Sequence, residues 1–63
     1  MKTYRSSKRI NGKVVEVVER IPRADEPCSV EIIYRGRQVV EVAGDDLLED
    51  LVKRAIREAE EIL

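Results

Sequence analysis

The chain has 63 residues, of which 43% are hydrophobic and 40% charged, and its net charge is −1. This length and balance predict one small globular domain over residues 1–63 and exclude a disordered chain. With one cysteine and no histidine, the chain lacks the residues for an intramolecular disulfide, a classical zinc site or a triad with an imidazole base.

The first predicted element is a strand over residues 3–10, joined to a second strand by Asn11-Gly12. Both turn residues tolerate positive φ, which a tight type I′ hairpin turn requires. Residues 1–13 hold five bases and no acid, whereas the other fifty residues hold seven bases and all thirteen acids. This pattern is typical of a charged edge strand, and it also suits contact with phosphate or with an acidic partner.

The second predicted strand covers residues 13–21, and its adjacent valines place apolar side chains on both faces, as in a central strand. Pro22 and Pro27 then bound a loop, because proline cannot continue a hydrogen-bonded ladder.

A second hairpin is predicted from strands over residues 28–34 and 37–43. Val30 and Ile32 share one face of the first of these strands, and Val40 and Val42 share one face of the other. Pairing these two faces requires an odd-length connection. We therefore expect a three-residue connection with a bulge at Gly36 instead of a two-residue turn.

The C-terminal segment predicts an amphipathic helix that begins after Asp46, with Asp46 and Glu49 as a relaxed capping box. An apolar stripe follows, formed by Leu48, Leu51, Val52, Ala55, Ala59 and Ile62. Opposite charges four residues apart are expected to pair as Glu49–Lys53, Asp50–Arg54 and Arg57–Glu61. The predicted fold is α+β, a four-stranded antiparallel sheet (ββββα) with one helix packed on one face.

Few residues suggest chemistry. Cys28 lies on the apolar face of its strand beside two acids, which favours a buried small hydrophobe over a reactive thiol. The acids at 45, 46, 49 and 50 lack the spacing of a calcium loop, and their place at a helix start explains them. We therefore expect no metal, no cofactor and no enzymatic activity.

Two surfaces are predicted for partners. Apolar side chains on both sheet faces, with only one helix to cover them, predict an interface on the uncovered face and a homodimer or another protein contact. That interface would contain Val14, Val18, Ile33 and Val39, with Val15 and Val17 in place of Val14 and Val18 if the register is shifted. The alternative is weak nucleic-acid binding through Lys2, Tyr4, Arg5, Lys8, Arg9 and Lys13.

From about residue 14 onward, the layout resembles the later part of a double-stranded RNA-binding domain. The shared features are a proline-containing loop, a glycine turn and a glycine before a helix with small residues, at Pro22, Gly36, Gly44, Ala55 and Ala59. The chain departs from that family where residues 3–10 replace the first helix, and where Ala24, Leu47 and Leu48 stand at the positions of its loop histidine and its lysine pair. The resemblance therefore implies a relative without the RNA surface, of a kind used for protein contacts or dimerisation.

No apolar run is long enough to span a bilayer and no signal-peptide pattern begins the chain, so we expect a cytoplasmic protein without a membrane partner. The abundance of Glu and Arg suits a thermostable protein, and it equally suits a designed scaffold that has no ligand.

Overall fold

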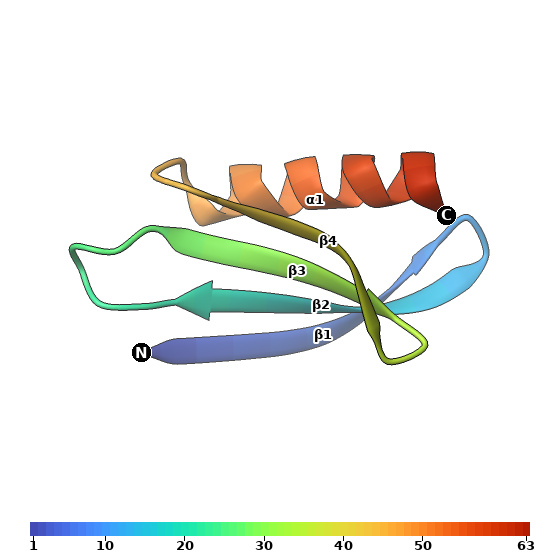
Figure 1. Cartoon of the computed structure of the whole chain (residues 1–63), viewed down its shortest axis with the longest axis horizontal. Coiled ribbons are helices and arrows are strands. Elements are labelled where there is room, and N and C mark those ends of the chain that lie inside the picture. Colours follow the sequence, from blue (N-terminus) through green and yellow to red (C-terminus); the bar gives the residue numbers. More distant parts are fainter.

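A computed structural model describes all residues 1–63. Its elements are β1 (Lys2–Ile10), β2 (Lys13–Ile21), β3 (Cys28–Tyr34), β4 (Arg37–Gly44) and α1 (Leu48–Ile62). The four strands form one antiparallel sheet in the order β1-β2-β3-β4, and α1 lies along β3 and β4 (Figure 1). The predicted α+β architecture is confirmed.

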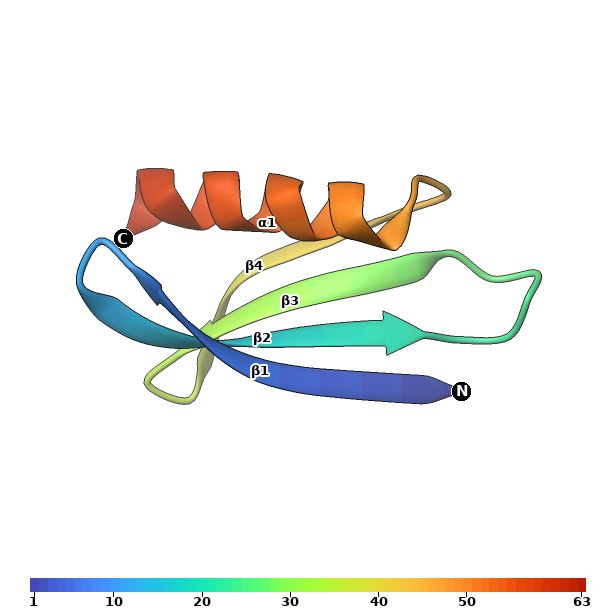
Figure 2. The ribbon, with the colours of Figure 1, turned by 180° about the vertical axis from the view of Figure 1, so that it is seen from behind.

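The first hairpin has the predicted two-residue turn, with positive φ at Asn11 (51°) and Gly12 (79°). Its tip bends toward the C-terminal end of α1, as Figure 2 shows from behind. There the Asn11 side-chain amide donates a hydrogen bond to the Glu60 carbonyl, and the Lys13 ammonium donates one to the Leu63 carbonyl, both at 3.0 Å. These bonds attach the tip of the hairpin to the last turn of the helix.

The second hairpin differs from the prediction. Its turn has only two residues, Arg35 and Gly36, both with positive φ, so the expected three-residue connection is wrong. The odd residue lies within β4 instead: Ile32 pairs with Val40 but Ile33 pairs with Gln38, which leaves Val39 as a bulge. The bulge restores the parity that brings the apolar sides of β3 and β4 onto one face.

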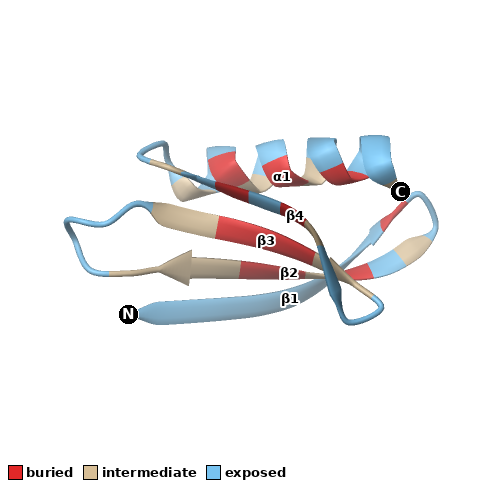
Figure 3. Ribbon diagram, in the orientation of Figure 1, coloured by how far each residue is buried: buried red, intermediate tan, exposed pale blue.

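The core lies between α1 and the sheet face that it covers. It consists of Ile10, Val15, Val17, Val30, Ile32, Val40, Val42, Leu51, Ala55 and Ala59. Burial is concentrated in the middle strands and along one side of the helix, whereas β1 is exposed up to its last residue, Ile10 (Figure 3). The predicted edge position of β1 is confirmed.

The helix begins differently from the prediction. Its N-cap is Leu47, without a side-chain cap, so the Asp46–Glu49 capping box does not form. The Asp46 carboxylate accepts a hydrogen bond from Arg54 at 2.8 Å instead, and none of the three predicted pairs four residues apart forms an ion pair. Ile62, predicted on the apolar stripe, is exposed.

Candidate protein-interaction surfaces

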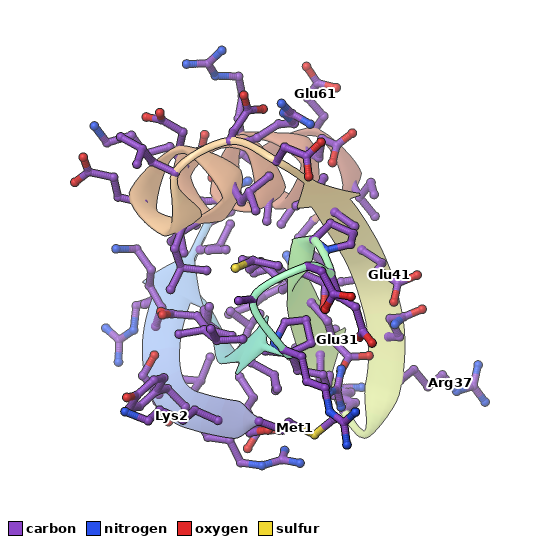
Figure 4. The ribbon with its side chains drawn as sticks, turned by 90° about the vertical axis from the view of Figure 1, so that its left-hand side faces the viewer. Met1, Lys2, Glu31, Arg37, Glu41 and Glu61 are labelled. Carbon is purple, nitrogen blue, oxygen red and sulfur yellow. The ribbon has the colours of Figure 1, made fainter.

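The strand register assigns each sheet residue to one of two faces. We call the face toward α1 the inner face and the opposite one the outer face. Viewed from the end, the sheet curls around the helix, with β1 and β4 at its two edges (Figure 4). The inner face is therefore concave and the outer face convex.

The predicted basic surface is divided between these faces. Lys8 pairs with the core residue Val15, so Lys2, Tyr4 and Lys8 belong to the inner face with Lys13 of β2. Arg5 and Arg9 belong to the outer face, where Arg5 forms an ion pair with Glu16 at 3.0 Å. The six residues predicted for nucleic-acid contact are thus divided between the two faces of the sheet.

Three of the predicted interface residues lie on the outer face. The register places Val14, Val18 and Ile33 there, as the prediction required. Val18 is fully buried, however, and Ile33 is half-buried, so only Val14 is substantially exposed, at 60%. Charged neighbours surround Val18, namely Arg5 and Glu31 on the adjacent strands and Glu16 and Arg20 two residues away on its own strand.

The placement of Val39 on that outer face is wrong. As the extra residue of the β4 bulge it leaves the alternation of the strand, and it packs against the core cluster instead. The prediction assumed an unbroken alternation from Arg37 onward, in which Val39 and Val40 would point to opposite faces.

Glu31 is the centre of the outer face. It is only 8% exposed, and its carboxylate accepts hydrogen bonds from Arg20 and from Gln38. Burial raises the pKa of this carboxyl, but the two hydrogen bonds and the positive charges of Arg20 and Arg5 outweigh burial and lower the pKa below its ordinary value. The outer face is therefore held together by polar contacts and does not present a continuous apolar patch.

A groove opens on the inner face because α1 lies over β3 and β4 and leaves the β1–β2 side of the sheet less covered. Its volume is about 560 Å³. We call it the α1–β1 groove, and it is lined by Leu48, Val52 and Ile56 and by Lys8, Glu19, Glu49 and Lys53. The three apolar residues are spaced four apart and are only partly buried. The apolar side of the helix is therefore wider than the part of it that packs on the sheet.

A smaller groove of about 320 Å³ lies on the other side of the helix, along the β4 edge. Three of its lining residues are Glu41, Glu58 and Glu61, so it is acidic and lacks an opposing base.

Cys28 is partly buried against the core, as its place on the apolar face of the strand predicted. No cluster of three or more acids, cysteines or histidines is placed to hold a metal ion, and the one helix is too short and too polar to cross a membrane.

No family model, curated protein or solved structure matches this chain. The resemblance to the double-stranded RNA-binding domain therefore stays a prediction. The function has to be inferred from the surfaces themselves.

Proposed function

We propose that the chain is a non-enzymatic protein-interaction module that forms a homodimer through the α1–β1 groove. The observation that supports the proposal is the partly buried apolar row of α1, formed by Leu48, Val52 and Ile56 beside an incompletely covered sheet. Burying such a row against a second copy would remove apolar surface from water on both chains.

The charges around the groove favour a second copy as the partner. Its rim carries two bases, Lys8 and Lys53, and two acids, Glu19 and Glu49. In an antiparallel pair of helices related by a two-fold axis near Val52, Leu48 of one chain would face Ile56 of the other, and Glu49 would lie close to Lys53. A strongly acidic or basic partner would meet as many like charges as opposite ones. A second copy instead carries both acids and bases, which can pair with the bases and acids of the first.

The exposed surface of the chain agrees with this proposal. A compact monomer of 7.2 kDa has an accessible surface of about 4,100 Å². This chain exposes 4548 Å², and only 12 of its 63 residues are buried. A dimer would cover part of the surplus and would stabilise the folded state by mass action.

Sedimentation velocity over a dilution series tests the proposal, with Val52→Lys as the perturbation and Val14→Lys as the matched control. Val52 lies in the α1–β1 groove and Val14 lies exposed on the outer face, so the same change is made on two different surfaces. The wild type and Val14→Lys should both reach twice the monomer mass at high concentration, and Val52→Lys should stay monomeric while keeping its circular dichroism spectrum. A wild type that is monomeric at every concentration, or equal effects of the two variants, would refute the proposal.

A further inference from the structure

The edge strand β1 is the most open element of the molecule. It extends over nine residues from Lys2 to Ile10, and all of them except Ile10 are exposed. It pairs with β2 without a bulge and contains no proline, so nothing interrupts its free side. The opposite edge is different, because the bulge at Val39 breaks the regularity of β4.

The register identifies the backbone groups on the free side. A two-residue hairpin turn makes Ile10–Lys13 a hydrogen-bonded pair, and hydrogen-bonded pairs then alternate with non-bonded ones along the ladder. The residues of β1 in the non-bonded pairs turn their N–H and C=O groups away from β2. These residues are Thr3, Arg5, Ser7 and Arg9. The free edge thus presents a regular row of donors and acceptors that another strand can satisfy.

The charge of β1 selects the kind of strand that can bind. The strand contains Lys2, Arg5, Lys8 and Arg9 and no acid, and of these four only Arg5 forms an ion pair within the chain. A second copy of β1 would bring like charges together, so these bases disfavour pairing of the strand with itself. The same bases attract an acidic strand.

We propose that the β1 edge binds an extended acidic segment of a partner protein, which adds to the sheet as a fifth strand. Residues directly opposite each other share a face, so acids opposite Arg5 and Arg9 would lie four residues apart in the partner. Next to the acid opposite Arg5, the residue opposite Tyr4 would be apolar or aromatic, because Tyr4 is half exposed on the inner face. The segment recognised is therefore one in which acidic and apolar residues alternate.

Fluorescence anisotropy tests this with a labelled peptide of about ten residues in which Glu alternates with Val and Tyr. Arg9→Glu should weaken binding about tenfold, since it replaces an attraction by a repulsion. Arg37→Glu, the same charge change on the opposite edge strand, should leave the affinity within about twofold. If both variants lose affinity equally, the peptide responds to the net charge of the molecule and not to the β1 edge, and the proposal is wrong.

The backbone contribution has its own test. A peptide of the same sequence, N-methylated at alternate residues, keeps its charge but cannot complete the ladder, so it should bind at least tenfold more weakly. In amide hydrogen exchange by NMR, the amides of Arg5, Ser7 and Arg9 should become protected when the unmodified peptide binds. Equal affinity of the two peptides, or no new protection, would overturn strand addition. Displacement of the peptide by a stoichiometric amount of double-stranded RNA would instead indicate that the basic side chains of β1 bind phosphate, and it would overturn the proposal.

These outcomes are separate from those of the proposed homodimer. Arg5, Arg9 and the free backbone groups of β1 lie outside the α1–β1 groove lining, and Lys8 is the one base of β1 that belongs to it. Val52→Lys should therefore bind the peptide with the affinity of the wild type, even if it no longer dimerises.

Discussion

Replacing Glu31 by Gln is expected to lower the free energy of unfolding by about 1–2 kcal/mol at pH 7. The Glu31 carboxylate accepts hydrogen bonds from Arg20 and Gln38 on a face where it is almost fully buried. A glutamine amide keeps one acceptor oxygen and turns the other into a donor, so one of these two bonds is lost. A hydrogen bond to a charged group contributes about 1.5–3 kcal/mol, but the side chain of Arg20 is 41% exposed and recovers part of this from water.

The effect should depend on pH in a defined direction. The pKa of Glu31 is lowered in the folded state, so its ionised form stabilises the fold at all pH values above the unfolded pKa of about 4.3. This contribution is lost as the pH falls through the folded pKa. A protonated glutamate closely resembles glutamine, so the stabilities of the wild type and of Glu31→Gln should converge in acid.

Thermal unfolding followed by circular dichroism measures the effect. For a domain of this size, 1 kcal/mol corresponds to about 4–8 °C, so at pH 7 the melting temperature of Glu31→Gln should be about 4–16 °C lower. Glu16→Gln is the matched control, because the Glu16 side chain is 43% exposed and its ion pair with Arg5 contributes at most about 1 kcal/mol. The reasoning is refuted if the gap between Glu31→Gln and the wild type is the same at pH 7 and pH 3.

Three further changes test the fold. Leu51→Ala removes a fully buried side chain and should lower the free energy of unfolding by about 2–5 kcal/mol, out of about 3–9 kcal/mol for a domain of this size. The urea midpoint should therefore fall sharply, whereas Leu47→Ala on the surface should change it little. Arg35→Asn should raise the free energy of unfolding by about 0.5 kcal/mol, because asparagine tolerates a φ of 53° better than arginine does. This gain should exceed the loss of the contact between Arg35 and the Tyr34 ring, so a lower melting temperature would contradict the argument. Deleting Val39 removes the bulge and leaves Ile33–Gln38 and Ile32–Val40 as consecutive pairs, so the cross-strand NOEs of these pairs should be kept; a shifted register would contradict the parity argument.

Most of the fold could be predicted because its signals are local. Asn11-Gly12 specifies a turn by its backbone freedom, and two prolines end a strand by removing donors. The position of the bulge in the second hairpin could not be predicted in the same way. The apolar pattern requires one odd residue somewhere between Ile32 and Val40, but parity alone does not distinguish a longer turn from a bulge at Val39.

The candidate surfaces were harder to predict because they depend on how elements cover one another. Alternation correctly placed Val18 on the outer face, but it does not show that long charged neighbours from three strands bury it there. The groove had a sequence signal in the four-residue spacing of Leu48, Val52 and Ile56. The spacing does not predict the lateral position of the helix on the sheet. The helix lies over β3 and β4, which leaves that row partly open.

The two proposed surfaces have only Lys8 in common. The groove lies on the inner face beside α1, whereas the basic edge directs its free backbone groups and the side chains of Arg5 and Arg9 elsewhere. A dimer formed through the groove would therefore carry two free β1 edges. A partner with two acidic segments joined by a linker of suitable length would bind such a dimer far more tightly than a monomer, because the second contact becomes intramolecular. Tandem peptides should then distinguish wild type from Val52→Lys, although single peptides do not.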